Sequence, residues 1–230
     1  MFKVCFSGGV DLNDFKETKE GHLVHLEIRT KYLLFKRAMD LTIGICSLIL
    51  LLPVMIIVSI LIYLLDGKPI LFKQARTGLR EQTFTIYKFR TMKPQNNQSI
   101  HKYRWDGGVP DDFVFKTTVN PNVTKLGATL RKLSLDELPQ LFNVIKGDMS
   151  IVGPRPEIPE ITRLYSSHQK MRLLVKPGIT GYAQVNGRAN STHGEKIWHD
   201  LYYLGNCSCM LDLKIILKTI YQVIVCKGSY

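Results

Sequence analysis

The chain has 230 residues, which suits one domain with an additional segment. Lysine and arginine outnumber aspartate and glutamate by 31 to 19, so the formal net charge is +12 and anionic partners are favoured. The basic residues are spread along the chain, which argues against nucleic acid and favours phospholipid or phosphorylated small molecules. Five cysteines without a C-x-x-C pair indicate neither a disulfide framework nor a zinc site, as is typical of a reducing, cytosol-facing compartment.

The N-terminal part contains an apolar run. Residues 1–31 are mixed and polar, and we treat them as an extension of unknown role. Leu41 to Leu65 carry no charge, and at about 1.5 Å per residue they are long enough to cross a hydrocarbon core of about 30 Å. The run starts too late and is too long for a cleaved signal peptide. We therefore assign residues 32–66 to a membrane-associated segment and residues 67–230 to one cytosolic domain.

Two details favour a re-entrant helix over a plain membrane span. Pro53 lies at the middle of the run, where it removes a backbone hydrogen bond and kinks a helix. Both flanks are basic, and basic residues next to membrane segments prefer the cytoplasmic side. A helix broken at Pro53 keeps both flanks in the cytoplasm, whereas a spanning helix is the alternative. The flanking residues are Arg29, Lys31, Lys36, Arg37, Lys68, Lys73, Arg76 and Arg80.

The stretch after the apolar run predicts a strand pair and then a loop. Residues 70–92 contain two β-rich segments around a turn at Thr77-Gly78, and "FTIYKF" is rich in strand formers. Lys88 and Arg90 are two residues apart and would share one face of such a strand, which is either a functional or a merely solvated face. Residues 93–112 are polar, with glycine, proline and asparagine, and predict a long loop.

The C-terminal half predicts mainly helices. "VTKLGATLRKLS" is typical of a short helix, and residues 158–174 have helical spacing that ends before Pro177-Gly178. "PGITGYAQVNGR" predicts a glycine-rich loop with a strand-like "YAQV" segment. The tail "LDLKIILKTIYQVIVCKG" predicts an apolar helix with a lysine-bearing face, which would lie on the membrane surface or against the core.

Adjacent carboxylates stand out in "LRKLSLDELPQLFNVIKGDMSIVGPRPE", residues 130–157. Ser134 and Glu137 have the spacing of a capping box, although Pro139 favours a helix start one or two residues later. In either register Asp136 and Glu137 lie near a first helical turn, where the helix dipole favours their ionised forms. Helix capping alone would account for such acids.

Their surroundings favour phosphate chemistry. Arg131 and Arg155 bracket the acids, and the Gly-Pro-Arg-Pro sequence around Arg155 predicts a rigid turn suited to a phosphate. A carboxylate near a phosphate can bind Mg²⁺, or it can attack phosphorus and form an aspartyl-phosphate type of adduct. Asp136 and Glu137 could divide these two roles.

Several motifs occur in an order that resembles the bacterial sugar transferase family, the monotopic polyprenyl-phosphate phosphoglycosyl transferases. They are "KRAMD", "IYKFRTM", "LRKLSLDELPQLFNVIKGDMSIVGPRPE", "KPGITGYAQVNGR" and "LDLKI". The resemblance covers about residues 32–227. It implies transfer of a sugar-1-phosphate from a UDP-sugar to undecaprenyl phosphate with release of UMP, the first membrane step of capsule, O-antigen, exopolysaccharide or glycoprotein glycan synthesis.

The resemblance also implies roles for individual residues. Asp136 corresponds to the nucleophile and Glu137 to the Mg²⁺ ligand, while Lys88 resembles an active-site lysine. Arg131 and Arg155 match arginines at the phosphates, and Arg90 is a less secure neighbour. We further expect Lys36 and Arg37 to contact lipid headgroups and Asp40 to pair with one of them.

We expect a helix-rich α/β fold with a small sheet: a re-entrant membrane helix-hairpin and a cytosolic catalytic domain with amphipathic interfacial helices. The expected location is the bacterial inner membrane, with the catalytic domain facing the cytoplasm. Expected partners are a UDP-sugar, undecaprenyl phosphate and inner-membrane phospholipid, but no nucleic acid; a homo-oligomer is compatible with the sequence. The alternative function is a membrane-anchored basic adaptor that binds anionic lipid without catalysis. We expect the sugar-specific pocket to involve residues 93–115 and "AQVNGR".

Overall fold

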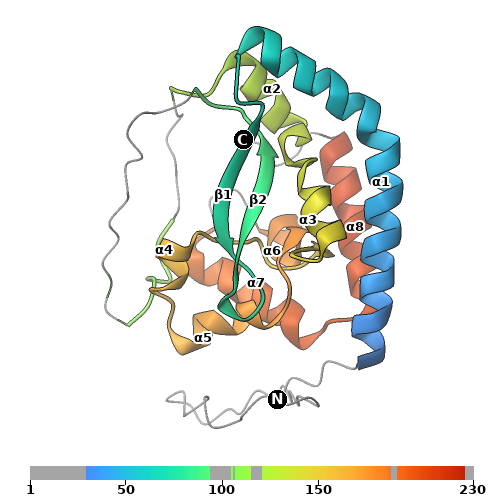
Figure 1. Ribbon diagram of the computed structural model, residues 1–230. Helices are drawn as coiled ribbons and strands as arrows, with labels where there is room; N and C mark the ends of the chain where they lie inside the picture. Colours follow the sequence, from blue (N-terminus) through green and yellow to red (C-terminus); the bar gives the residue numbers. More distant parts are fainter. Residues whose placement is uncertain (1–29, 94–104, 106, 115–120, 188–190, 226–230) are drawn as a thin grey trace.

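The computed structural model describes residues 30–93, 105, 107–114, 121–187 and 191–225. The N-terminal extension and most of the 93–112 loop therefore lie outside the described residues. One long helix, α1 (Thr30–Leu65), runs along one side of the molecule and curves over one end of it (Figure 1). Within the described part, α1 is the one helix that by length and composition is able to cross a membrane. It continues through Pro53.

The predicted strand pair is confirmed. Strands β1 (Leu71–Thr77) and β2 (Thr83–Phe89) pair antiparallel, with Leu71 opposite Phe89 and Thr77 opposite Thr83. The single-turn helix η2 (Leu79–Glu81) closes the hairpin directly after Gly78. The hairpin crosses the middle of the molecule (Figure 1), and β2 contacts the segment that carries the acid pair.

The remaining chain is mostly helical, as expected, around a second small sheet in which β3 and β4 pair in parallel. Its elements are α2 (Lys125–Lys132), η3 (Leu135–Glu137), α3 (Gln140–Lys146), β3 (Ser150–Val152), α4 (Pro159–Thr162), α5 (Ser167–Lys170), η4 (Met171–Leu174), β4 (Gly178–Thr180), α6 (Tyr182–Asn186), α7 (His193–Gly205) and α8 (Cys209–Ile224).

Two expectations about local structure are wrong. The "YAQV" segment forms helix α6, because Gly181 begins a helical turn that directs Val185 into the core. Residues 158–174 form three short helices in place of one. Pro159 starts α4, and Ser166 then starts α5 with its own capping box, so the chain changes direction between them.

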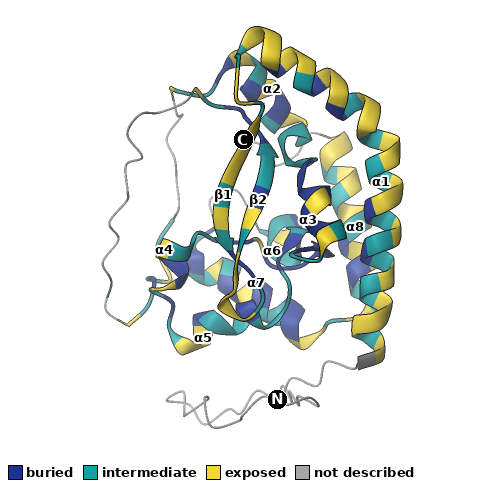
Figure 2. Cartoon of the chain, viewed as in Figure 1, coloured by how far each residue is buried: buried dark blue, intermediate teal, exposed yellow. Residues whose placement is uncertain are grey.

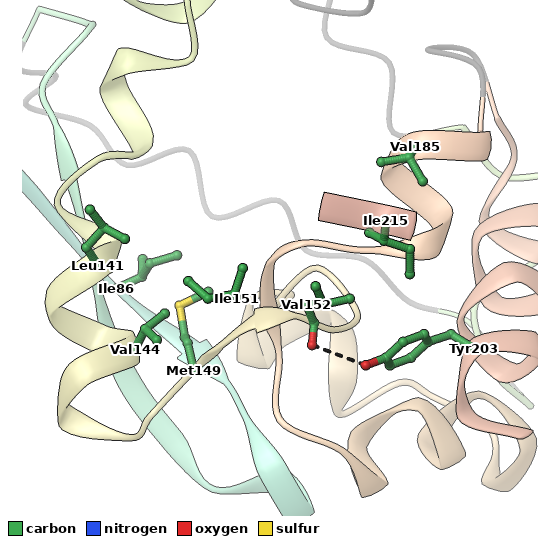
Figure 3. Packing of buried hydrophobic residues seen from close by; sticks show 9 residues of the cluster. All are labelled: Ile86, Leu141, Val144, Met149, Ile151, Val152, Val185, Tyr203 and Ile215. Carbon is green, nitrogen blue, oxygen red and sulfur yellow. Dashed lines mark hydrogen bonds between the residues drawn. The ribbon is translucent and has the colours of Figure 1, made fainter. Parts of the chain in front are cut away.

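The main core joins elements that are far apart in the sequence. Side chains from β2, α3, β3, α6, α7 and α8 pack together, and the Tyr203 hydroxyl reaches the Val152 carbonyl oxygen at 3.3 Å (Figure 3). A second cluster packs Met55, Val58 and Ile62 of α1 against the domain. The α1 helix is therefore packed against the domain in both of its halves, because Ile43 and Leu48 contact the main core.

The outer sides of α1 and α8 are apolar and exposed (Figure 2). On α8 the exposed side chains recur every three or four residues, which places them on one helical face. The exposed apolar residues of α8 are Met210, Leu213, Leu217, Ile220, Tyr221, Val223 and Ile224.

Lys36 and Arg37 of α1 face the domain, contrary to the expectation that they contact headgroups. Lys36 Nζ pairs with the buried Asp212 carboxylate at 2.9 Å. Arg37 donates to the carbonyl oxygens at the end of α3, those of Val144 at 2.7 Å and Ile145 at 2.9 Å. The reason is that a helix end leaves carbonyl oxygens unpaired, and a guanidinium can satisfy two of them.

The expected pairing of Asp40 with Lys36 or Arg37 is also wrong. The Asp40 carboxylate accepts hydrogen bonds from Ser150 Oγ and the Ile151 backbone, each at 2.9 Å. These donors lie on β3, so the contact fixes α1 to the second sheet.

Candidate active site

The acid pair lies in η3, the single turn between α2 and α3. Ser134 adopts a left-handed conformation with φ of 55° and makes no side-chain cap, so the predicted capping box is not formed. Pro139 is the residue before α3, in agreement with the later helix start that its ring favours. The chain thus reverses at Ser134 and presents Asp136 and Glu137 toward the β1–β2 hairpin, where Lys88 meets Glu137.

Glu137 is held by two cations from different segments. Lys88 Nζ lies 2.6 Å and Arg155 Nη2 lies 2.9 Å from the same oxygen, Oε1. Burial raises the pKa of Glu137, but Arg155 and Lys88 outweigh it and lower the pKa to about 2. Glu137 is therefore ionised throughout the physiological range, and its second oxygen is not used by these two contacts.

Asp136 has a different environment from its neighbour. Among the described residues, none makes a hydrogen bond or ion pair to its half-buried carboxylate. Burial and the charge of Glu137 raise its pKa, while Lys88, Arg131 and Arg155 oppose this shift. A carboxylate without a fixed partner, beside an ionised one, is the arrangement expected of a group that acts on a ligand.

The structure brings most of the predicted site residues together. Asp136, Glu137, Lys88 and Arg155 form one cluster, and Arg131 lies close enough to lower the pKa of Asp136. Arg131 Nε donates to Thr91 Oγ1 at 2.9 Å.

Arg90 is not part of this cluster. Its guanidinium donates to three carbonyl oxygens directly after α1, those of Asp66 and Gly67 at 2.6 Å and Lys68 at 3.2 Å. Its side chain is buried there. Arg90 thus closes the C-terminal end of α1, and the structure places it away from the acid pair.

Asn143 was not singled out from the sequence. This fully buried residue of α3 accepts from the Tyr87 backbone at 3.2 Å and donates to the Thr85 carbonyl at 2.7 Å. Both contacts are to β2, so Asn143 fixes the strand that carries Lys88 against the helix that follows Glu137. The available signal was a polar residue in the apolar face of "LFNVI".

The donor set is compatible with Mg²⁺. Mg²⁺ is usually bound by one or two carboxylates, with substrate phosphates and water as further ligands. Asp136 and Glu137 are adjacent carboxylates, and each has an oxygen outside the ion pairs described above. No group of three or more candidate ligands occurs among the described residues, so a bound Mg²⁺ would need ligand or water oxygens as well.

The chain belongs to the bacterial sugar transferase family, whose sequence model matches residues 31–226. This range starts at the beginning of α1 and extends to the end of α8, and it includes every residue of the acid cluster.

Similar chains occur among bacterial proteins named for sugar transfer or exopolysaccharide production. The uncharacterized sugar transferase EpsL of Bacillus subtilis (strain 168) is 41% identical over 85% of this chain and 90% of its own length. The exopolysaccharide production protein ExoY of Sinorhizobium fredii is 39% identical over 85% of this chain and 88% of its own length. The UDP-glucose:undecaprenyl-phosphate glucose-1-phosphate transferase of Escherichia coli (strain K12) is 36% identical over 86% of this chain, but over only 42% of its own length.

Proposed function

We propose that this protein transfers a sugar-1-phosphate from a UDP-sugar to undecaprenyl phosphate and releases UMP. Relatives named for this reaction with N-acetylgalactosamine or glucose support the general chemistry. The observation that carries the proposal is the contrast within the acid pair. Glu137 is ionised and forms ion pairs with Lys88 and Arg155, whereas no described residue forms an ion pair or a hydrogen bond with the Asp136 carboxylate.

This contrast supports a two-step transfer. In the first step an Asp136 carboxylate oxygen attacks the phosphorus that carries the sugar, the bond to the bridging oxygen breaks, and UMP leaves. In the second step a phosphate oxygen of undecaprenyl phosphate attacks the same phosphorus and the Asp136 carboxylate is regenerated. No net proton or electron transfer is required, and each step exchanges one phosphorus–oxygen bond for another.

The neighbouring cations suit the charge of such a substrate. Burial and Arg155 lower the pKa of Lys88, although Glu137 opposes this effect. Half of the Arg155 side chain is exposed, so its guanidinium can contact a phosphate while it remains beside Glu137. Arg131 adds a third positive charge near Asp136. Together these side chains would bind and orient a diphosphate next to the Asp136 carboxylate.

We assign a bound Mg²⁺ to Glu137, with Asp136 as a neighbouring carboxylate. When bound, the ion supplies positive charge that offsets the repulsion between the diphosphate and the two carboxylates. Lys88 and Arg155 hold one Glu137 oxygen, and this contact orients the carboxylate group.

We place the protein on the cytoplasmic face of the bacterial inner membrane, with α1 as a re-entrant helix. Its two ends are both held by polar contacts to the same domain: Lys36 pairs with Asp212 near one end, and Arg90 and Thr124 contact Asp66 at the other. A helix that crossed the bilayer would separate these ends. The exposed apolar faces of α1 and α8 would then lie in the lipid.

UMP release tests this reaction against the alternative of a lipid-binding adaptor without catalysis. Purified protein is incubated with Mg²⁺, undecaprenyl phosphate and a panel of UDP-sugars, and UMP is measured. We expect release with at least one donor and a loss of at least about 1000-fold in Asp136→Asn, because the amide is not a nucleophile. Membrane binding should be unchanged in this variant.

Asp148→Asn is the matched control, since it removes one carboxylate from the same motif outside the acid cluster. The control should keep near-normal release. Normal UMP release by Asp136→Asn would refute the assignment of the nucleophile. Membrane binding by the wild-type protein without UMP release from any donor would favour the adaptor.

A further inference from the structure

The turn that carries Arg155 has an unusual backbone. Pro154 and Pro156 flank Arg155, and proline has no backbone N–H group. The turn can therefore be fixed in place mainly through its carbonyl oxygens, which accept hydrogen bonds from other segments. This limitation makes the donors of those hydrogen bonds important for the position of Arg155.

Four consecutive carbonyl oxygens of this turn each have a donor. Gly178 N donates to Pro154 at 2.9 Å, and Thr77 N donates to Glu157 at 2.9 Å. The two carbonyls between them accept from arginine side chains, Arg172 Nη2 to Arg155 at 3.0 Å and Arg76 Nη1 to Pro156 at 3.3 Å. The shorter of these two arginine contacts is made to Arg155 itself.

Arg172 is well suited to fix a backbone carbonyl. Its side chain is only 4% exposed, and the same Nη2 that donates to Arg155 lies 2.6 Å from Asp200 Oδ2. Its Nη1 donates to the Tyr165 hydroxyl at 2.8 Å. The guanidinium is thus held between η4, α7 and the segment after α4, with its charge balanced by an equally buried carboxylate.

We infer that Arg172 is a positioning residue for Arg155, and that Asp200 balances the charge of Arg172 and orients its guanidinium for this role. This inference rests on the function proposed above. Arg172 holds the carbonyl of Arg155, and Arg155 Nη2 contacts Glu137 Oε1 at 2.9 Å. The chain of contacts from Asp200 to Glu137 therefore connects α7 with the acid pair. Arg172 itself makes no contact with the acid pair among those described.

An ammonium group would not replace this guanidinium. Arginine presents its N–H donors in a rigid plane, so it can donate to the Arg155 carbonyl and the Tyr165 hydroxyl while it is ion-paired with the Asp200 carboxylate. A lysine at position 172 keeps the charge but has one nitrogen at the end of a flexible chain. Arg172→Lys should therefore retain the ion pair with Asp200 and lose part of the positioning.

The test removes the buried pair as a unit, because removing one member would leave an unpaired buried charge and disturb folding. In Arg172→Met with Asp200→Leu both charges are replaced by apolar side chains of similar size. The pair is combined with Arg155→Ala in a double-mutant cycle, and kcat/KM for UMP release is measured. Leu204→Ala removes buried apolar packing between α7 and η4 without removing a polar contact to the turn, so it controls for lost stability.

We expect the pair substitution to lower kcat/KM about 10-fold when Arg155 is present, and by less than about 2-fold in the Arg155→Ala background. Leu204→Ala should lower the melting temperature and leave kcat/KM within about 2-fold of wild type. Arg172→Lys should fall between wild type and the pair variant. Equal losses with and without Arg155 would show that the pair acts on general structure, and would overturn the inference.

A second measurement does not depend on catalysis. Phenylglyoxal modifies accessible guanidinium groups, and mass spectrometry gives the labelling rate of each arginine. We expect Arg155 to be labelled at least about 3-fold faster in the pair variant, because it leaves Glu137 more often, and at the wild-type rate in Leu204→Ala. An unchanged Arg155 rate would overturn the inference. If Arg155 is labelled faster in the pair variant but the wild-type protein releases no UMP, the proposed function is refuted and the positioning role of Arg172 is retained.

Discussion

At the scale of single residues, two neighbouring carboxylates differ because of their partners. Glu137 has Lys88 and Arg155 within hydrogen-bond distance, and its pKa is lowered to about 2. Asp136 lies one residue away without such partners, and burial together with Glu137 raises its pKa. Paired groups whose environments shift their pKa values in opposite directions are typical of active sites.

The lowered pKa of Glu137 predicts a pH dependence of stability. Its ordinary value is 4.5, so the ion pairs stabilise the folded state fully above pH 4.5, and this contribution is lost as the pH falls toward 2. A shift of this size corresponds to on the order of 3 kcal/mol. Glu137→Gln should therefore be less stable than wild type at pH 7, and the difference should shrink between pH 4.5 and 2.

Urea unfolding in detergent at several pH values measures this difference. Asp148→Asn serves as a control, because it also removes a carboxylate beside a lysine but lies outside the acid cluster. A stability difference between wild type and Glu137→Gln that stays constant from pH 7 to pH 2 would show that the two ion pairs do not stabilise the fold.

The sequence singled out the acid pair because Arg131 and Arg155 bracket it, and it added Lys88 only through the family resemblance. It did not identify Asn143, Arg172 or Asp200. These residues are buried polar groups. Asn143 donates to the carbonyl of Thr85, 58 positions away, and Arg172 donates to the carbonyl of Arg155, 17 positions away, so only the fold shows these contacts. Arg90, by contrast, was included from the sequence but is not part of the acid cluster. Its two-residue spacing from Lys88 suggested a shared site, whereas its side chain closes the end of α1.

At the scale of elements, α1 is attached to the domain along its length. Arg37 caps the C-terminal end of α3, and Asp40 binds β3. The far half packs Met55, Val58 and Ile62 against Phe89 and Leu130. The element that precedes the catalytic domain in sequence therefore also supports the helix that follows the acid pair.

Both ends of α1 should lie on the same side of the membrane. In a cysteine-free variant, single cysteines replace Lys31 and Lys73, which are exposed residues on either side of the apolar run. A membrane-impermeant maleimide should label neither position in intact spheroplasts and both after lysis. Lysis is the control for reactivity. Labelling of one position in intact spheroplasts would establish a spanning helix and contradict the re-entrant arrangement.

The type of most elements was predictable from local patterns, but their continuity was not. The hairpin and the C-terminal helix follow from alternation and helical spacing. The "YAQV" segment has strand-forming residues and is nonetheless helical, because its position after Gly181 and the packing of Val185 outweigh local preference. Pro53 predicted a broken helix, and the structure has a continuous one that curves (Figure 1).

At the scale of the whole molecule, the candidate site is formed by segments that are distant in sequence. Lys88 comes from the hairpin, the acid pair from the turn before α3, and Arg155 from the turn after β3. Asp200 of α7 and Arg172 support the last of these turns. Motif order alone indicated the family, whereas the convergence of these segments requires the three-dimensional fold.

The proposed membrane association also bears on the position of the site. The same domain that holds the acid pair is fixed to α1, whose outer side is apolar and exposed (Figure 2). A protein that joins a water-soluble nucleotide sugar to a membrane-bound phosphate needs its nucleophile within reach of the bilayer surface. The contacts that fix α1 to the domain are compatible with this requirement of the proposed function.

The most direct test of the central claim is intact-protein mass spectrometry after brief incubation with a UDP-sugar and Mg²⁺, without undecaprenyl phosphate. We predict a mass increase equal to one sugar-1-phosphate less one water, located on Asp136 by peptide mapping, absent in Asp136→Asn and lost when undecaprenyl phosphate is added. UMP formation that requires both substrates together, with no adduct on Asp136 at any time, would contradict the account.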